Sequence, residues 1–163
     1  MPRSRLSIVV NLGWVLALLV SAVSAGADGV PQRYMTLRAS EVNLRAGPGE
    51  QYPIQWVYRR KGLPVEVLGK SDVWRKIRDW QGTEGWVHER MLTGTRDVIV
   101  RGAVRSLRRD ADPASDIVAR AEPGVIAKLL ECRGAWCRVE TSDIRGWLGR
   151  NELWGVDPDE EVR

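Results

Sequence analysis

The chain has 163 residues, of which 28% are charged and 44% hydrophobic, and its formal net charge is +4 at pH 7. Eight Trp and many aliphatic residues exclude an intrinsically disordered chain, and one His with two Cys are too few for a Cys/His zinc site. A Ser-His-Asp enzyme would have to use His88 as its base, because the chain has no other His.

Residues 1–27 have the three-part layout of a secretory signal peptide. A short basic start is followed by an almost wholly apolar run over residues 6–23 and then by small residues. We expect cleavage after Ala25 or Ala27, and a protein that is periplasmic or otherwise exported. The alternative is an uncleaved membrane anchor, because the apolar run is just long enough to span a bilayer.

The remainder of the chain is nearly neutral. Residues 1–27 hold two Arg and no acidic residue, so 23 basic and 21 acidic side chains remain, a net charge of +2. Both signs are interspersed without a basic stripe, so we expect no nucleic-acid partner. No later segment is apolar enough to cross a bilayer, so we expect no stable membrane span after signal cleavage.

The rest of the chain consists of two copies of one sequence repeat. Three pairs of matching residues recur at offsets of 62, 62 and 61: Gly62 and Gly124, Trp74 and Trp136, Trp86 and Trp147. This internal repeat predicts two modules, residues 37–94 and 95–156, followed by an acidic tail at 157–163 that should be frayed. The link between the modules is very short, which favours an interface over independent tumbling.

Each module is all-β by pattern. Val65 and Val67 alternate with Glu66, residues 55–58 are rich in β-formers, and Gly and Pro clusters punctuate the chain between such runs. We expect about five short strands per module, and no helix beyond a 3₁₀ turn near residues 89–92. Closing so small a sheet into a barrel removes its exposed edges. The predicted fold class is therefore all-β, with two tandem small β-barrels.

Module 1 carries a specific motif. It reads Val-Asn-Leu-Arg-Ala-Gly-Pro-Gly at 42–49, Tyr-Pro-Ile at 52–54, Trp-Arg-Lys-Ile at 74–77 and Gly-Trp-Val at 85–87. This resembles the bacterial SH3-like (SH3b) domain family, whose members are envelope-associated binding modules that in several cases accompany peptidoglycan hydrolases. The resemblance covers both modules, although residues 106–113 of module 2 lack the Asn and both glycines of the motif.

The resemblance implies a non-catalytic exported binding module of the bacterial cell envelope. It would recognise peptidoglycan or wall peptides through module 1. The alternative is a structural or adaptor protein that presents a surface to an envelope protein partner. The candidate ligand-binding residues are Asn43, Arg45, Trp74, Trp80 and Trp86. The sequence leaves open the oligomeric state and whether module 2 binds anything.

The motif loop has a physical interpretation of its own. Gly47 and Gly49 allow backbone angles that other residues resist, and Pro48 fixes one φ between them, so the loop should hold one shape. Asn43 and Arg45 flank the loop on one strand face. Arg45 would either satisfy loop carbonyls or receive a ligand carboxylate.

Three tryptophans of module 1 are candidate ligand platforms. If Ile77 is in the core, strand alternation turns Trp74 outward, toward a groove, unless a bulge reverses it. Trp74 and Trp86 loosely match aromatic positions of the eukaryotic SH3 groove, but the Pro and Tyr that complete that groove are missing. Recognition of proline-rich segments is therefore not expected. Trp80 should lie at a hairpin tip, where it either binds a ligand or folds back over the barrel or onto module 2.

Other aromatic residues have structural expectations. Trp56 and Tyr58 share one strand face and are expected in the core or between the modules rather than as ligand platforms. Trp154 should cap module 2 or dock on module 1.

Cys132 and Cys137 bracket a turn at Gly134, so they should face each other across a hairpin. Because an exported compartment permits a disulfide, we predict a Cys132–Cys137 bond. The rival roles are a catalytic thiol or a metal ligand, for which no partner lies near in sequence.

No arrangement of residues points to catalysis. Asp79 and Glu84 lie on either side of a hairpin, and nothing in the sequence indicates that either carboxyl is buried. No Gly-rich phosphate-binding loop leads into a helix. We therefore expect no enzyme, no cofactor and no metal site.

Overall fold

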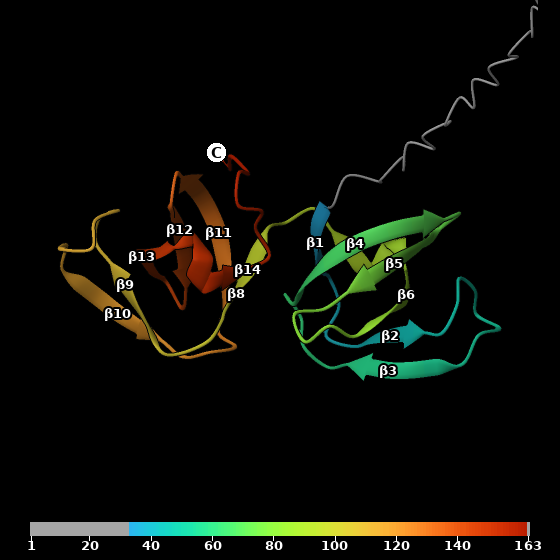
Figure 1. Ribbon diagram of the computed structural model, residues 1–163. Coiled ribbons are helices and arrows are strands. Elements are labelled where there is room, and N and C mark those ends of the chain that lie inside the picture. The colour runs from blue at the N-terminus through green and yellow to red at the C-terminus, as the bar shows by residue number, and fades with distance from the viewer. Residues whose placement is uncertain (1–32, 163) are drawn as a thin grey trace, which may run out of the picture.

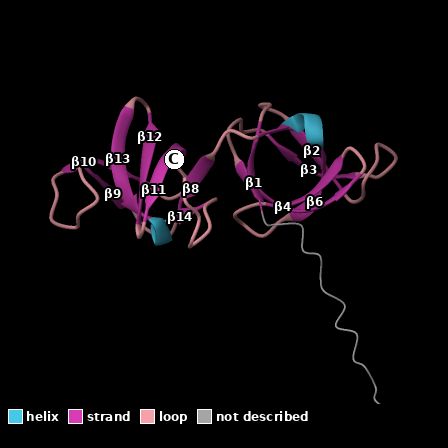
Figure 2. Ribbon diagram, turned by 90° about the horizontal axis from the view of Figure 1, so that it is seen from above, coloured by secondary structure: helices cyan, strands magenta, loops and turns pink. Residues whose placement is uncertain are grey.

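The computed structural model describes residues 33–162, so the expected signal peptide at 1–27 lies outside the described residues. Two antiparallel sheets follow each other along this part of the chain, each curled around its own core (Figure 1). Viewed from above, the two modules lie side by side (Figure 2). The all-β prediction, with two tandem SH3-like modules, is confirmed. No helix within residues 33–162 is long and apolar enough to span a membrane.

The first sheet has seven strands in the order β3-β2-β6-β5-β4-β1-β7. Their bounds are β1 (Arg33–Leu37), β2 (Val42–Arg45), β3 (Ile54–Tyr58), β4 (Pro64–Ser71), β5 (Trp74–Arg78), β6 (Glu84–His88) and β7 (Leu92–Thr93). A 3₁₀ turn, η1 (Glu89–Met91), precedes β7, which confirms the prediction of such a turn. Strand pairing does not close the sheet, because β3 and β7 remain as edges.

The second sheet repeats this order as β10-β9-β13-β12-β11-β8-β14. Its strands are β8 (Asp97–Val100), β9 (Arg105–Arg108), β10 (Ile117–Ala121), β11 (Ile126–Arg133), β12 (Trp136–Thr141), β13 (Ile144–Gly149) and β14 (Leu153–Trp154). A second 3₁₀ turn, η2 (Arg150–Glu152), matches η1. The sequence repeat is therefore also a repeat of topology.

The prediction of about five strands misses two in each sheet. In module 1 these are β1 and the two-residue β7, which pair with each other, and β1 pairs with β4 as well. Most of β1 lies ahead of the predicted module start at residue 37. Its sequence, Arg-Tyr-Met-Thr-Leu, has no clean polar and apolar alternation, which hid it from the pattern analysis.

Strand β8 is shared between the two cores. Val98 and Val100 belong to the core of module 2, whereas Ile99 belongs to the core of module 1 with Leu44 and Ile77. Period-2 alternation explains this division, since successive side chains of a strand point to opposite faces. All three β8 residues are fully buried. The strand thus joins the modules through their interiors.

Polar and aromatic contacts add to the interface that the short link predicts. The Thr36 hydroxyl donates to the Thr95 carbonyl oxygen at 2.7 Å, and Arg60 donates across the modules to the Gly124 carbonyl at 2.9 Å. Trp154 docks on module 1, because its ring lies 5.2 Å from that of Tyr34 in an edge-to-face arrangement. The inter-module interface is therefore confirmed.

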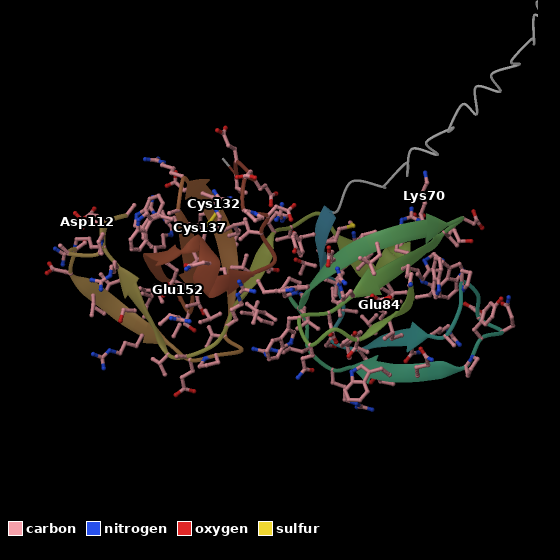
Figure 3. The ribbon with its side chains drawn as sticks, in the orientation of Figure 1. Lys70, Glu84, Asp112, Cys132, Cys137 and Glu152 are labelled. Atoms are coloured by element: carbon pink, nitrogen blue, oxygen red, sulfur yellow. A yellow bond between two sulfur atoms is a disulfide. The ribbon has the colours of Figure 1, made fainter. Side chains whose placement is uncertain are left out.

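The predicted disulfide joins Cys132 and Cys137 across the β11–β12 hairpin (Figure 3). Both residues are buried in the core of module 2. The expectation from hairpin geometry is confirmed, because the two residues are cross-strand partners and their Cα atoms are 4.0 Å apart.

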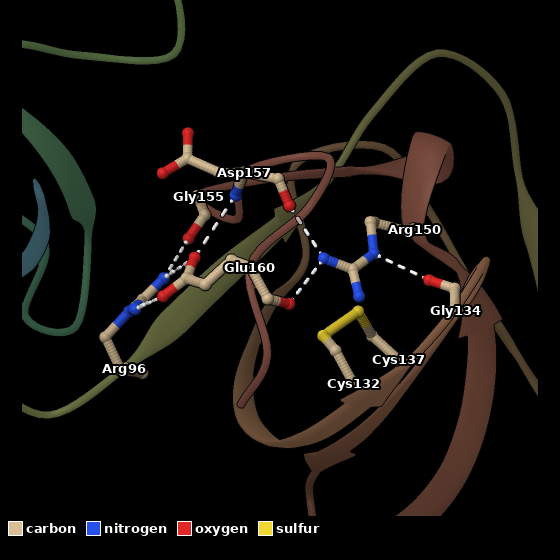
Figure 4. The surroundings of a disulfide bond; sticks show 8 residues. All are labelled: Arg96, Cys132, Gly134, Cys137, Arg150, Gly155, Asp157 and Glu160. Carbon is tan, nitrogen blue, oxygen red and sulfur yellow. Dashed lines mark hydrogen bonds and ion pairs between the residues drawn. A yellow bond between two sulfur atoms is a disulfide. The ribbon is translucent and has the colours of Figure 1, made fainter. Parts of the chain in front are cut away.

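The acidic tail does not fray, which corrects the sequence prediction. Glu160 accepts hydrogen bonds from the Arg96 guanidinium, and Arg150 Nη1 donates to the carbonyl oxygens of Asp157 and Glu160 at 2.7 Å each (Figure 4). The Val162 carbonyl accepts from the Cys132 amide at 2.9 Å. Composition predicted a solvated tail, but two arginines of the folded body supply its partners.

Candidate functional site

Arg45 holds the loop between β2 and β3 in place. Its Nη1 donates to the carbonyl oxygens of Glu50 and Tyr52 at 3.0 and 2.8 Å. Of the two roles that the sequence leaves open, the geometry shows the structural one, because Nη1 satisfies loop carbonyl oxygens. This residue fixes the shape of the loop from the end of β2.

The glycines of the motif act differently from the prediction. Neither Gly47 nor Gly49 has a positive φ, so backbone freedom is not what the loop requires of them. A Cβ at Gly47 would lie 2.5 Å from the ring of Tyr52, and one at Gly49 would lie 2.2 Å from Gln51 Oε1. Gln51 is exposed and flexible and could move away from a side chain at position 49, so of the two glycines only Gly47 is packed against a ring.

A groove runs beside this loop, between it and the β4–β5 hairpin. Its volume is about 440 Å³. We call it the loop groove, and its lining residues are Pro48, Gly49, Glu50, Gln51, Ser71, Asp72, Val73, Trp74 and His88. The motif loop and one of the five candidate residues, Trp74, thus belong to the same concavity.

Trp74 forms a buried part of the loop groove. It lies outside the core cluster that contains Ile77, as alternation predicts. Its ring is nevertheless only 9% exposed, because His88 covers it edge-to-face with ring centroids 5.4 Å apart. His88 Nδ1 accepts from the Arg90 amide at 3.1 Å, which fixes the imidazole over Trp74. The prediction of an outward-facing Trp74 is right about the face and wrong about the exposure.

Glu50 and Asp72 add carboxylates to this lining, and both residues are exposed. The groove therefore combines a fixed aromatic pair with acceptors for hydrogen bonds. Such a lining suits a small ligand that carries methyl groups and N–H donors.

The other candidate residues do not gather there. Asn43 is exposed on β2 opposite Val57, and Trp86 is half-buried on β6, where it pairs with Arg45 and with Lys76. Neither is among the residues that line the loop groove. The predicted set is thus spread over the module rather than forming one site.

Trp56 and Tyr58 behave oppositely, although they were predicted to share a role. Tyr58 is buried in the core of module 1, but Trp56 is 54% exposed, which corrects the expectation for it. Because β3 is an edge strand, its first residues, including Ile54, run past the core. Alternation predicts a face but not whether a neighbour covers it.

Trp80 lies at the tip of the β5–β6 hairpin, as predicted, and lines a second and larger groove. This inter-module groove has a volume of about 1130 Å³. Module 1 contributes Tyr34, Glu66, Arg78, Asp79 and Trp80, and module 2 contributes mainly Arg101, Arg150, Asn151, Trp154 and Asp157. Sequence reasoning missed this groove because its walls come from both modules and from the tail.

Asp79 is used inside the hairpin rather than for chemistry. Its Oδ1 accepts from the amides of Gln81 and Thr83 at 2.9 and 2.8 Å, and its Oδ2 accepts from the Tyr58 hydroxyl at 3.0 Å. Burial, followed by the Asp79 charge, raises the pKa of Tyr58 well above its usual value. Glu84 pairs with Lys76 at 3.0 Å. These two carboxylates therefore stabilise the fold.

Glu66 is buried in a polar cluster on the module 1 side of the inter-module groove. Arg78 donates to its Oε2 through Nε and Nη2, at 3.0 and 2.8 Å. Burial and the neighbouring Glu66 charge raise the pKa of Tyr34 to about 12. Tyr34 thus stays a neutral hydroxyl at physiological pH. Within residues 33–162 no three His, Cys, Asp or Glu side chains gather as a metal site.

The two curled antiparallel sheets, with the same strand order, define the class of the fold as two tandem SH3-like modules. Two stretches of the chain, residues 38–94 and 103–155, match the bacterial SH3 domain family. The chain belongs to this family, with two modules in tandem.

Known proteins similar to this chain include a much longer one. This chain is 23% identical over 124 residues to the putative N-acetylmuramoyl-L-alanine amidase YrvJ of Bacillus subtilis (strain 168). The match covers 69% of this chain and 24% of the amidase. The chain thus corresponds to about a quarter of that relative.

Two solved structures match parts of this chain with low TM-scores. NlpC2 from Trichomonas vaginalis matches with a TM-score of 0.35 and 13% identity, over 76% of this chain and 48% of that one. An NlpC/P60 family protein from Bacillus cereus ATCC 10987 matches with a TM-score of 0.34 and 15% identity, over 74% and 55%.

Proposed function

We propose that this chain is an exported, non-catalytic binding protein of the bacterial cell envelope that recognises peptidoglycan, through its wall peptides, at module 1. Membership of the bacterial SH3 domain family supports a binding role. The name of the curated relative refers to a muramoyl–alanine bond of the wall, and the matched part is only 24% of that protein. The disulfide and the predicted signal peptide support an oxidising, exported location.

The observation that carries the proposal is the loop groove. Arg45 and the packed Gly47 fix its wall before any ligand arrives, so little ordering entropy is lost on binding. Wall peptides carry methyl groups, which would lie against Trp74 and His88. Their amide and amino groups would donate to Glu50 and Asp72.

Co-sedimentation with purified peptidoglycan sacculi, at low and at high salt, tests the proposal. The protein would be residues 28–163, which remain after the expected cleavage. We expect salt-resistant pelleting that Trp74→Ala abolishes. Because Trp74 is buried, its truncation could also unfold the module, so Glu50→Lys on the exposed rim is the second variant. It should weaken binding about tenfold.

Glu122→Lys is the matched control, since Glu122 is an exposed glutamate of module 2. It should pellet like the unsubstituted protein. Equal pelleting of the Glu50 and Glu122 variants would contradict a site in the loop groove. No pelleting of the unsubstituted protein at either salt would contradict peptidoglycan binding as a whole.

One observation favours the alternative, an adaptor that binds an envelope protein. The edge strands of both modules expose apolar side chains: Ile54 and Trp56 on β3, and Ile117 and Val118 on β10, are 38–54% exposed. Unpaired edges of this kind can accept a strand from a partner. Cross-linking in cells would test this if sacculi do not retain the protein.

A further inference from the structure

Trp80 is a large aromatic residue that lies on a rigid hairpin tip and is partly exposed. The Asp79 carboxylate accepts from two amides of the hairpin loop, so the tip cannot easily rearrange. The Trp80 side chain is 36% exposed and lines the inter-module groove. An exposed aromatic ring in a concave, rigid site is typical of a ligand platform.

Module 2 shows that the fold does not require a tryptophan at this hairpin tip. In module 1 the β5–β6 hairpin places five residues between the paired Arg78 and Glu84. In module 2 the corresponding hairpin pairs Thr141 with Ile144 and turns on two residues, Ser142 and Asp143, which have φ values of 48° and 65°. Between the equivalent pairs Arg78–Glu84 and Glu140–Arg145, module 1 has only one residue more, and Ser142 stands at the position of Trp80, 62 residues on.

The opposite wall of the groove is also preformed. The Trp154 ring is held against Tyr34, and Arg150 binds the carbonyl oxygens of Gly134 and Asp157, at 2.9 and 2.7 Å (Figure 4). These contacts fasten β14 to β1, and η2 to the β11–β12 turn and to the tail. A ligand would therefore meet two rigid walls rather than two mobile modules.

The chemistry of the lining disfavours an anionic ligand. Arg78 is bound to Glu66, and acidic residues outnumber basic ones in the lining: Glu66, Asp79, Asp157, Asp159 and Glu161 against Arg78, Arg101 and Arg150. Asp157 and Asp159 add acceptors to the lining. Guanidinium, amide and carboxylate groups around aromatic rings match a ligand whose hydroxyls both donate and accept.

We infer that the inter-module groove is a second binding site, and that its ligand is an uncharged saccharide chain whose pyranose rings stack on Trp80. The inference rests on the proposed function in one respect, since the glycan strand belongs to the same wall polymer as the peptides. The groove is larger than the ~300–1,000 Å³ usual for small-molecule sites, which suits a chain segment better than one sugar. This groove requires both modules, because residues of each line it.

Titration of residues 28–163 with N-acetylchitotetraose, followed by calorimetry and by indole N–H shifts in NMR, tests this site. We expect saturable binding that Trp80→Ala weakens at least about tenfold and that Trp80→Phe partly retains. Trp56→Ala is the matched control, because Trp56 is even more exposed but lies on β3, outside the groove. It should leave the affinity unchanged.

The outcomes separate this site from the proposed function. No saturable binding of the tetrasaccharide, or equal affinity in the Trp80→Ala variant, overturns the saccharide site even if sacculi still retain the protein through Glu50. Binding that depends on Trp80 supports the saccharide site, even if Glu50→Lys has no effect on pelleting and the peptide site fails. Saturable binding of a basic peptide in place of the tetrasaccharide would also overturn it.

Discussion

The two modules share a frame and differ in the loops that the frame holds. Gly62 and Gly124 have φ values of 83° and 86°, at the same point of each repeat. Gly85 and Gly146 lie under the backbone of the strand beside them, where a Cβ would be 2.9 and 3.1 Å from the carbonyl oxygens of Arg45 and Arg108. These matched positions are what two divergent sequences need to build the same barrel.

The loops after β2 and β9 share backbone hydrogen bonds and differ in their side chains. The Gly49 amide donates to the Gly47 carbonyl oxygen at 3.0 Å, and the Asp112 amide donates to the Asp110 carbonyl oxygen at 2.8 Å. In module 1 Gly47 accepts a neighbouring ring onto the backbone. In module 2, where the motif is lost, the Asp110 amide donates to Ser115 Oγ at 3.0 Å and the Ala114 amide donates to Asp112 Oδ1 at 2.7 Å. Departure from the motif therefore keeps the backbone hydrogen bonds of the loop, and changes the side chains and the surface that the loop offers to a ligand.

The sharpest test of the shared frame is to add one methyl group at the same position of both modules. At Gly85 the new Cβ would lie 2.6 Å from Leu44 Cγ, whereas at Gly146 its nearest neighbour, Leu107 Cβ, is 2.9 Å away. We expect Gly85→Ala to lower the free energy of unfolding by about 3 kcal/mol and Gly146→Ala by about 2 kcal/mol, measured by urea denaturation. Equal stability of Gly85→Ala and the unsubstituted chain would contradict the frame as described.

The disulfide is a covalent difference between the modules. At the positions of Cys132 and Cys137, module 1 has the cross-strand pair Lys70 and Arg75. Because the closed loop is short, we expect the double variant Cys132→Ser, Cys137→Ser to lose about 2 kcal/mol of unfolding free energy.

Lys70→Ser is the matched control for that variant, because Lys70 is exposed (Figure 3) and lies at the equivalent site. It should change the free energy of unfolding by less than about 0.5 kcal/mol. A comparable loss in both variants would mean that the hairpin position, and not the bond, matters.

Arg45 and Arg108 occupy equivalent strand ends and test how the two loops are fastened. Arg45 Nη1 donates to two loop carbonyls, whereas Arg108 donates to one, that of Ser115, at 2.7 Å. We expect Arg45→Ala to cost about 1.5 kcal/mol and Arg108→Ala about half of that. Amide hydrogen exchange should accelerate in residues 46–53 more than in residues 109–116, and the reverse order would contradict the comparison.

The tail follows module 2 alone, and its expected contribution is smaller than that of Arg45. Hydrogen bonds from Arg96 lower the pKa of Glu160 below its ordinary value of 4.5. The charged carboxylate therefore stabilises the fold above that pH, and this stabilisation is lost as the pH falls through the lowered pKa. Burial raises the pKa of Asp157, so the charged form of Asp157 has the opposite effect on stability. Asp157 is present in both the unsubstituted chain and the Glu160 variant.

We expect Glu160→Gln to cost about 1 kcal/mol at neutral pH, and the difference from the unsubstituted chain to shrink below about pH 4.5. Urea denaturation at successive pH values measures this. A difference that stays constant down to pH 3 would contradict the Arg96–Glu160 contribution.

Local signals in the sequence predicted much of the fold. The repeat offset of 61 or 62 residues gave the two modules, and the turn at Gly134 gave the disulfide. These features depend on neighbours within one hairpin or on identical residue types. By contrast, Glu160 pairs with an arginine 64 residues away, and no pattern in the tail itself indicates such a partner.

The candidate site was harder to predict because a groove depends on which strands lack a neighbour. Alternation placed Trp74 on the correct face but could not show that His88 covers it. The same rule grouped Trp56 with Tyr58, although only Tyr58 lies over the core. Trp80 was recognised as a hairpin tip, but its surroundings come from module 2 and the tail.

Because β8 contributes side chains to both cores, neither module has a complete core without it. The matched family ranges, 38–94 and 103–155, both leave out residues 97–100, so a fragment cut at those limits would lose Ile99 from one interior or Val98 and Val100 from the other. Heating should therefore produce a single calorimetric transition rather than two. We therefore expect the two repeats to unfold together, as one cooperative unit.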